Sequence, residues 1–276
     1  MPLMNIPFWH YGMLRDTERT QFYEDIIKKN CAGKVILEIG SGSGLLSALA
    51  LQHGAKHVYA VEENTQLAES SLKLIKRLNL ENRFTLFNKN STKLELNELP
   101  KVDIILHEIF GSDPFAENVI LTLTDAKRFL KPDGILLPES IYLTFRTLKT
   151  KEVAPLIYNN IELTEALDLF SNHYPNITID SDANENNTLF ITQEIRLSEL
   201  IDNKNFAATI TSDQLTKANL LEVAFIIKHN DDSILSYEIG SKKQPKHWSS
   251  FLLVRKSQGT PEVTFTLGNT NRLVCI

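Results

Sequence analysis

The stretch KVILEIGSGSGLLSALALQHG, residues 34–54, decides the fold expected for this chain. Residues 34–39 form a short apolar run that glycines stop, which is the pattern of a buried strand in a parallel sheet. Residues 44–54 follow as a helix that ends at Gly54, because glycine commonly terminates helices. A strand, a glycine turn and a helix in this order predict one unit of an α/β sheet.

A helix is expected before this stretch, over residues 11–30. Its apolar positions recur at helical spacing. They are Leu14, Phe22, Ile26 and Ile27. Asp16 or Thr17 is the expected cap at its start.

After the glycine turn the alternation of strand and helix continues to about residue 138. Strands are expected over 57–62, 84–88 and 102–108, and helices over 65–79 and 116–130, with a turn at KPDG and a last strand at ILLP. This alternation predicts a parallel sheet that helices cover on both faces.

Beyond about residue 140 the pattern changes to strand-like runs separated by turns, which predicts an antiparallel sheet or barrel. The runs cover residues 141–148, 189–197, 222–230, 249–256 and 261–268. One helical candidate, IELTEALDLF, forms a short insert near 155–175, and the Asn-rich residues 171–188 are expected to be an exposed or mobile loop. The expected fold class is therefore α/β, with a Rossmann-like domain over 1–140 and an antiparallel β-barrel-like domain over 141–276.

Composition limits the classes of function. The 276 residues carry a net charge of −5, which disfavours nucleic-acid binding because that function normally requires a positively charged surface. The two cysteines are too few for a disulfide framework, and the scattered histidines give no reason to expect a metal. No signal peptide is evident at the start, and no apolar run is long enough to cross a membrane. We expect a soluble, cytoplasmic protein.

The glycine turn combines Gly40, Gly42 and Gly44 with an acid on either side, Glu38 and Glu62. The turn lies at the carboxyl end of a strand, where open α/β sheets bind ligands, and an acid ending the next strand can accept both hydroxyls of a ribose. The G-x-G-x-G spacing differs from that of dinucleotide enzymes, which disfavours a nicotinamide oxidoreductase. The pattern favours S-adenosylmethionine as the cofactor; the alternative is a tight strand–helix turn in another α/β protein.

A second acidic motif is HEIFGSDPFAE, residues 107–117, with Glu108 after an apolar strand and Glu117 beyond a turn. The turn contains Gly111, Asp113 and Pro114. Two acids brought together can hold a guanidinium, whose planar fork of N–H groups matches carboxylates. Beside a cofactor turn, this suggests methyl transfer to arginine. The alternative is a surface acid and a helix N-terminal acid.

Four motifs, in this order, resemble those of the protein arginine methyltransferase family over nearly the whole chain. They are MLRDTERT (Met13, Leu14, Asp16, Arg19 and Thr20), ILEIGSGSG, the pair Glu108 and Glu117 with Gly111 between them, and Lys246-His247-Trp248. The stretches AVEENTQLAESS and NKNSTKLEL are most similar to sequences of the branch that makes only monomethylarginine.

The resemblance implies roles for individual residues. Arg19 would pair with the cofactor's carboxylate, Ser91 would contact the adenine edge, and Met13 would lie against the reacting methyl group. The three glycines would line the methionine and ribose parts, and Glu62 the ribose. Asp16 and His247 would form a pair beside the active site, with His247 as proton acceptor or relay, and Trp248 would contact the substrate.

The chain also departs from the family pattern. Ile109, Phe110 and Ser112 replace aromatic residues, Val119 replaces a methionine of dimethylating members, and Lys246 replaces a threonine. The dimerisation arm is short, although the resemblance allows a homodimer. The acceptor is either an arginine-containing protein or free L-arginine. A non-catalytic cofactor-binding module is the further alternative, and a nucleic-acid methyltransferase is disfavoured because HEIF stands in place of its Pro-Pro motif.

Overall fold

The computed structural model describes residues 9–148, 157–158, 161–162, 174–175, 189–203, 206–217, 220–230, 233–236, 248, 251–254, 259–268 and 272–275. The chain divides into two compact units. Unit 1 comprises Met1–Ile109, Val119–Ser140 and Lys228–Leu235, and unit 2 comprises Phe110–Asn118, Ile141–Ile227 and Ser236–Ile276. The sequence predicts two continuous domains, 1–140 and 141–276. The units instead exchange two short segments, because each segment packs with residues distant in the sequence.

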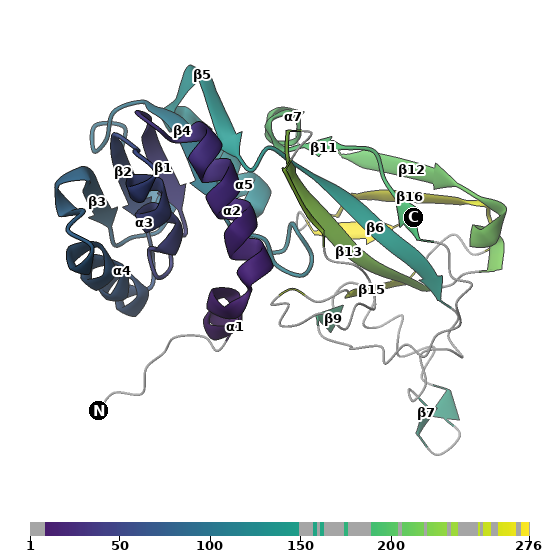
Figure 1. Ribbon diagram of the computed structural model, residues 1–276. Helices are drawn as coiled ribbons and strands as arrows, with labels where there is room; N and C mark the ends of the chain where they lie inside the picture. Colours follow the sequence, from purple (N-terminus) through teal and green to yellow (C-terminus); the bar gives the residue numbers. More distant parts are fainter. Residues whose placement is uncertain are drawn as a thin grey trace. The chain divides into compact units, whose positions relative to one another are not determined.

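Unit 1 is built on a parallel sheet of five strands in the order β3-β2-β1-β4-β5 (Figure 1). The strands are β1 Val35–Ile39, β2 His57–Val61, β3 Phe84–Phe87, β4 Val102–His107 and β5 Leu130–Leu137. All four pairings between neighbouring strands are parallel, as predicted. In this order β1 lies between β2 and β4, so residues at the carboxyl ends of these three strands are neighbours.

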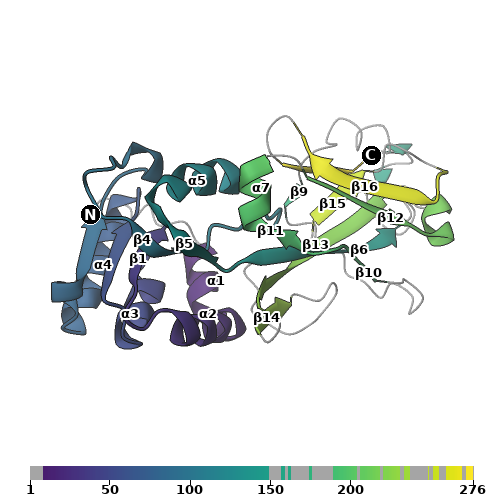
Figure 2. The same ribbon diagram turned by 90° about the horizontal axis from the view of Figure 1, so that it is seen from above.

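Helices cover both faces of this sheet. Figure 2 shows α2 (Thr17–Asn30) and α3 (Leu45–Gln52) on one face and α5 (Val119–Ala126) on the other. The fourth helix of the alternation is α4, Thr65–Arg77. The central strands are apolar and buried, as expected for a sheet covered on both faces. Their fully buried side chains include Ile36, Leu37, Val58, Ile105 and Leu106.

The predicted helix over 11–30 is in fact two helices, α1 (Trp9–Arg15) and α2. Asp16 lies between them in an extended conformation, and its carboxylate accepts a hydrogen bond from the backbone N–H of Arg19 at 2.9 Å. This N-cap starts a new helix because the cap residue itself is not helical. The prediction of an apolar stripe holds in α2 but is wrong for Leu14, which is 52% exposed.

Two predicted boundaries near α5 are also wrong. The helix predicted over 116–130 begins only at Val119, because Asn118 has a positive φ of 56°, which an α-helix does not contain. The predicted KPDG turn lies inside β5, where the pairing with β4 shifts between Val102 and Ile104. The pairing with β4 passes from Leu130 to Ile135, so residues 131–134 stand outside it, and Lys131 pairs with Asp103 at 2.6 Å.

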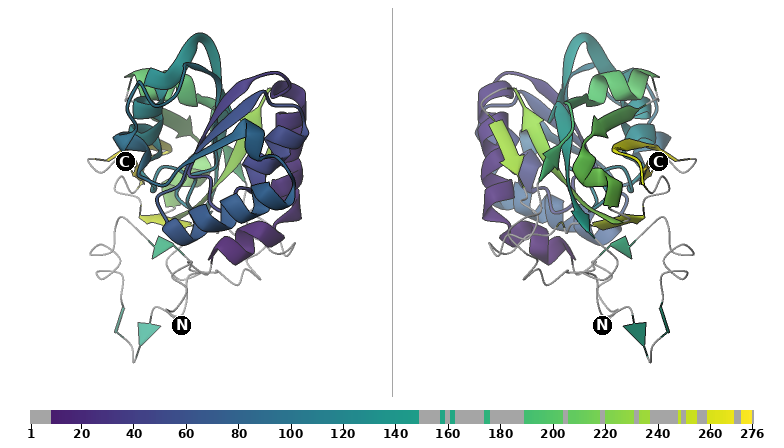
Figure 3. Two further views of the ribbon diagram at one scale, coloured as in Figure 1. Left: turned by 90° about the vertical axis from the view of Figure 1, so that its left-hand side faces the viewer. Right: turned by 90° about the vertical axis from the view of Figure 1, so that its right-hand side faces the viewer.

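The described strands from β6 onward form antiparallel sheets, which confirms the predicted antiparallel pattern; of these strands, β14 lies mainly in the segment Lys228–Leu235 of unit 1. One sheet has the order β10-β6-β13-β15-β9, with β11 beside β6 and β14 beside β13, and a second has the order β12-β16-β17. Figure 3 shows β6 and β13 side by side. The bounds are β6 Ser140–Leu148, β9 Tyr174–Pro175, β10 Phe190–Ile191, β11 Ile195–Arg196, β12 Ala207–Thr211, β13 Leu220–His229, β14 Ser233–Ser236, β15 Phe251–Val254, β16 Glu262–Leu267 and β17 Leu273–Cys275.

Residues 189–197, predicted as one strand, form two short strands and the start of a helix, α7 (Leu197–Asn203). The break falls at Thr192, whose hydroxyl accepts from the N–H of Leu143 and donates to the carbonyl of Gln193, both at 3.0 Å. A side chain that bonds the backbone in this way interrupts a strand ladder. The strand β12 is not predicted from the sequence.

The helical candidate near 155–175 begins at Ile161–Glu162, which forms strand β8 and pairs with β7, Ile157–Tyr158. The rest of this candidate, and most of the predicted loop 171–188, lies outside the described residues. In the ranges that the structure describes, no helix combines the length and apolarity needed to cross a membrane.

The core of unit 2 is aromatic. Phe145 on β6 stacks on Phe190 with ring centroids 5.0 Å apart and meets Phe265 edge-on at 4.8 Å. Phe145 is completely buried. Aromatic contacts of this kind stabilise a core beyond the area that they bury.

Phe145→Ala should therefore lower the free energy of unfolding by about 3–5 kcal/mol, because it leaves a cavity among these rings. Chemical denaturation followed by circular dichroism measures the change. Ile191→Ala is the control, since Ile191 is 55% exposed, and it should have little effect. Equal stabilities of the two variants would contradict this description of the core.

Candidate active site

The glycine turn after β1 requires its glycines. Gly40, Gly42 and Gly44 have positive φ angles of 67°, 54° and 81°. A Cβ atom built at Gly40 would lie 2.9 Å from Cγ2 of Ile109, and one at Gly44 would collide with the side chain of Ser71. The turn leads directly into α3, so its backbone N–H groups lie at the positive, N-terminal end of that helix dipole.

Glu62, immediately after β2, bonds to this turn. Its Oε2 accepts from the N–H of Gly42 at 2.7 Å, and its Oε1 accepts from the N–H of Asn64 at 2.8 Å. Asn64 in turn caps α4 with its side chain. The carboxylate is therefore fixed between the glycine turn and the start of α4, with lone pairs left on each oxygen.

Glu38, on β1, is 2% exposed and accepts a hydrogen bond from the hydroxyl of Ser47 on α3. Burial raises the pKa of Glu38 to about 8, although the hydrogen bond from Ser47 opposes the shift. The carboxyl group is therefore mainly protonated at neutral pH in the cofactor-free chain.

Glu108, immediately after β4, forms a buried ion pair with the guanidinium of Arg19 on α2. The guanidinium also lies over the ring of Tyr23, 5.2 Å from its centroid. The hydroxyl of Tyr23 donates to the carbonyl of His107 at 3.2 Å. Tyr23 therefore contacts both the cation and the strand end that carries the anion.

His107 stays neutral at this strand end. Its Nε2 lies 3.2 Å from the carbonyl oxygen of Pro138, and burial lowers its pKa to about 4. A neutral imidazole whose Nε2 carries the proton donates to that carbonyl, so His107 fixes the end of β4 without adding charge.

His10, on α1, belongs to the same region and is missed by the sequence analysis. Burial lowers its pKa, the charges of Glu62 and Glu108 raise it, and Arg19 lowers it. A Cβ atom at Gly42 would lie 3.9 Å from Cε1 of His10. Its spacing could have indicated it: His10 lies three residues before Met13, and residues three apart share one face of a helix. Met13 is half-buried on α1.

Ser91, the predicted adenine contact, is half-buried on the 3-10 helix Ser91–Lys93. The segment before it is attached to the end of β2. The amide of Asn88 donates to the carbonyl of Glu62 at 2.8 Å, and that of Asn90 donates to the carboxylate of Glu63 at 2.9 Å. These bonds keep Ser91 near the acid that follows β2.

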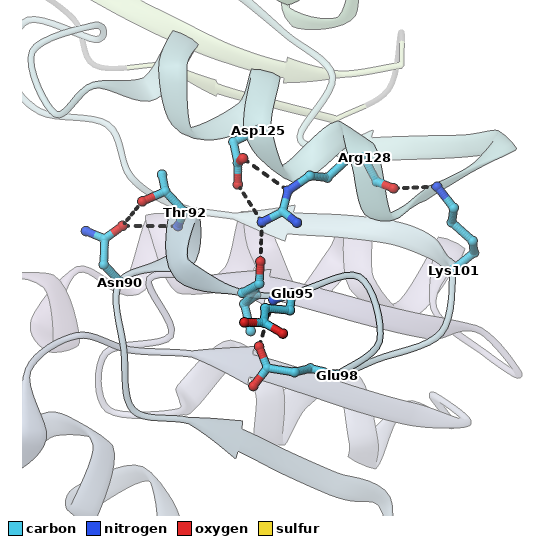
Figure 4. Close-up of polar contacts among 8 residues, drawn as sticks. Asn90, Thr92, Glu95, Glu98, Lys101, Asp125 and Arg128 are labelled. Atoms are coloured by element: carbon cyan, nitrogen blue, oxygen red, sulfur yellow. Dashed lines mark hydrogen bonds and ion pairs between the residues drawn. The ribbon is translucent and has the colours of Figure 1, made fainter.

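The segment after Ser91 is held by Arg128, as Figure 4 shows. Arg128 bonds both oxygens of Asp125, at 3.0 and 3.2 Å, and donates to the carbonyl of Leu94. Lys101 donates to the carbonyl of Arg128 itself. The loop between β3 and β4 is thus fixed to the helical segment before β5.

The remaining predicted residues belong to unit 2 or are not described. Glu117 is exposed in the segment Phe110–Asn118 of unit 2, whereas Glu108 belongs to unit 1, so their pairing stays a prediction. Lys246 and His247 lie outside the described residues, and the pair of Asp16 with His247 also stays a prediction.

Within unit 2, the segment that carries Glu117 is anchored at two points. The indole of Trp248 donates to the carbonyl of Phe110 at 2.7 Å, and the carboxylate of Asp113 accepts from the N–H groups of Phe115 and Leu273 at 2.9 and 3.2 Å. Trp248 is buried, so the structure shows it supporting this segment, and its predicted substrate contact is untested.

Buried polar atoms near the glycine turn fit a polar ligand. The hydroxyls of Ser41 and Ser71 and the side-chain oxygen of Gln66 are buried without a hydrogen-bond partner. Buried polar atoms normally have partners, so these atoms suit a ligand with several polar groups. In the part of the chain that the structure describes, no group of His, Cys, Asp and Glu could hold a metal ion.

A parallel sheet with this glycine turn and its flanking acids, followed by an antiparallel β unit, defines a class I methyltransferase fold. A family model described as conserved hypothetical protein 95 matches residues 16–170, and the chain belongs to this family.

Comparison with curated proteins confirms the resemblance to arginine methyltransferases. An arginine N(omega)-methyltransferase of Streptomyces achromogenes subsp. streptozoticus is 36% identical over 156 residues, 55% of this chain and 43% of that protein. Protein arginine N-methyltransferase 1 of Oryza sativa subsp. indica is 33% identical over 159 residues, 55% of this chain and 41% of that protein. The chain thus spans less than half the length of these relatives.

A solved structure extends the likeness of the fold to both units. The Trypanosoma brucei PRMT1 enzyme-prozyme heterotetrameric complex with AdoHcy aligns with a TM-score of 0.71 and 20% sequence identity. The alignment covers 94% of this chain and 86% of that chain. The predicted fold, a Rossmann-like unit with an antiparallel barrel-like unit, is confirmed.

Glu38→Gln should flatten the pH dependence of stability of the cofactor-free chain. The folded-state pKa of about 8 exceeds the ordinary value of 4.5, so the folded chain keeps a proton that the unfolded chain has lost. The free energy of unfolding therefore falls as the pH rises through this window, and the substitution removes that part of the fall.

Denaturant titrations at about pH 5 and about pH 8 measure this difference. Glu69→Gln, which changes an exposed acid on α4, is the control and should behave as the wild type. The same pH dependence in wild type and Glu38→Gln would show that Glu38 does not titrate in this window.

Proposed function

We propose that this chain is an S-adenosylmethionine-dependent arginine N-methyltransferase. The observation that carries the proposal is the buried carboxylate of Glu108, which already accepts a guanidinium, that of Arg19. It lies in the same unit as the glycine turn and Glu62. The names of the similar proteins support the same activity.

The cofactor would be held by residues of unit 1. Glu62 would accept the ribose hydroxyls, the turn at Gly40, Gly42 and Gly44 would approach the methionine and ribose parts, and Ser91 would meet the adenine edge. Arg19 would pair with the carboxylate, and Met13 and His10 would approach from α1. Glu38 would hold the turn in place indirectly, because its carboxyl group accepts a hydrogen bond from Ser47 on α3, the helix that follows the turn.

The residues of the chain would prepare the acceptor for attack. A guanidinium has a pKa above about 12 and arrives protonated and delocalised. Glu108 and Glu117 would hold two of its nitrogens and draw the positive charge toward them, so that the third nitrogen regains lone-pair character. The bound cofactor supplies the methyl group on a sulfonium. His247, oriented by Asp16, would accept or relay the proton that the product loses.

The acceptor is an arginine residue of a protein or free L-arginine. The Oryza relative is named a protein arginine methyltransferase, whereas the name of the Streptomyces relative specifies arginine alone. The second name is the observation that favours a small-molecule acceptor. A non-catalytic binding module is less well supported, because both glutamates and the cofactor acid are retained. A homodimer and a cytoplasmic location stay predictions.

Mass spectrometry of acceptors after incubation with S-adenosylmethionine tests the proposal. Free L-arginine is compared with arginine-rich peptides, and a gain of one methyl group identifies the acceptor class and the product. Transfer to neither acceptor, with cofactor bound, would support the binding-module alternative.

Glu108→Gln and Glu117→Gln should each lower kcat at least about 100-fold, because one carboxylate cannot organise the guanidinium fork alone. Glu69→Gln is the matched control and should keep wild-type turnover. Near-normal turnover of Glu108→Gln would contradict the mechanism.

A further inference from the structure

The connection between β3 and β4 differs from the other connections in the parallel sheet of unit 1. Helices α3, α4 and α5 join the other pairs of consecutive strands, whereas residues 88–101 contain only the short 3-10 helix Ser91–Lys93. This connection begins at the carboxyl end of β3, on the side where open α/β sheets bind ligands. Because no regular helix holds it, its position depends on side chains of neighbouring elements.

Arg128 fixes the middle of this connection from the 3-10 helix that follows α5, Lys127–Phe129. Its Nη2 donates to the carbonyl of Leu94, and Asp125 accepts from its Nε at 3.0 Å and from its Nη2 at 3.2 Å (Figure 4). Its Cζ also lies 4.3 Å from the centroid of the Phe129 ring. A planar guanidinium held by a carboxylate and a ring has a defined orientation, so it fixes the carbonyl that it contacts.

Leu94 transmits this attachment to Ser91. The N–H of Leu94 donates to the carbonyl of Ser91 at 3.1 Å, and the side chain of Leu94 is buried. On the other side of Ser91, Asn90 caps the same turn and donates to the carboxylate of Glu63 at 2.9 Å. The residue predicted to meet the adenine edge is therefore held from two directions, by Asn90 and by Arg128.

The contacts of Glu98 lie within the connection itself. Its Oε1 accepts from Lys89, and its Oε2 accepts from the N–H of Glu95 at 2.7 Å. These bonds keep residues 89–98 compact, but they do not attach them to another element of unit 1. The hydrogen bond to the carbonyl of Leu94 makes that attachment, and it comes from Arg128.

We propose that Arg128 is a positioning residue for the base of the cofactor: it holds Ser91 at the adenine edge through Leu94, and thereby sets the selectivity of the site for adenine. This inference rests on the proposed function, because it requires S-adenosylmethionine at the carboxyl edge of the sheet. Arg128 acts without touching the cofactor. Loss of its guanidinium lets the turn shift, and hydrogen bonds to a base edge weaken steeply when distances and angles change.

Calorimetric titration of the full chain with S-adenosylhomocysteine and with S-inosylhomocysteine tests the proposal. The two ligands share their homocysteine and ribose parts, but the inosine base carries a carbonyl group and an N–H where adenine carries an amino group and an acceptor nitrogen. The wild type should bind S-adenosylhomocysteine at least about tenfold more tightly, because a mismatched edge leaves polar groups unpaired. In Arg128→Met this preference should fall at least about threefold, because the adenine edge is no longer met accurately.

Arg77→Met is the matched control, since it makes the same substitution at an exposed arginine at the end of α4, and it should keep the wild-type preference. Asp125→Asn is the second variant, because it removes one of the two carboxylate oxygens that orient Arg128. It should lower the preference by a smaller factor. The side chain of Asp125 is 30% exposed, so this variant is expected to fold, and circular dichroism verifies the folding of each variant.

A wild-type preference in Arg128→Met, with equal losses of affinity for both ligands, would overturn the inference and leave the proposed function intact. The same holds for an unchanged preference in Asp125→Asn if Arg128→Met does not fold, and for a wild type that binds both ligands equally. A wild type that does not bind S-adenosylhomocysteine at all would overturn the proposed function, and the inference with it.

Discussion

Unit 1 depends on the compensation of three buried carboxyl groups at one edge of its sheet. Glu38 lies on β1, and Glu62 and Glu108 follow the neighbouring strands β2 and β4. Each is compensated differently: Glu38 by protonation, Glu62 by two backbone N–H groups, and Glu108 by a guanidinium. A buried carboxylate without such a partner would destabilise the fold, so the glycine turn and α2 are both needed to build this edge.

This requirement explains the N-terminal helices. Asp16 ends α1 and caps α2, which places Arg19 one turn into α2. Tyr23, one turn further on, is completely buried against both Arg19 and the end of β4. The residues that begin α2 therefore stabilise the carboxyl end of β4, where Glu108 lies.

The sequence predicts those parts of the fold that local patterns determine. Apolar runs that end at glycines predict the parallel strands. The turn after β1 is recognisable from its glycines, because Gly40, Gly42 and Gly44 all adopt positive φ angles, which favour glycine. The sequence predicts less where distant residues decide the outcome. The partner of Arg19 is 89 positions away in the sequence, and Lys131 of β5 pairs with Asp103 of β4. The charges that act on His10 come from Glu62, Glu108 and Arg19, which are also distant in the sequence. The exchange of residues 110–118 and 228–235 between the units has no local signal.

The most direct test of this account is calorimetric titration of the wild type with S-adenosylhomocysteine. The carboxyl edge of the sheet should bind it saturably, one molecule per chain. Glu62→Ala should bind at least about tenfold more weakly, because hydrogen bonds to a charged carboxylate are lost. A wild type that does not bind, or a variant that binds equally well, would contradict the assignment of this edge as the cofactor site.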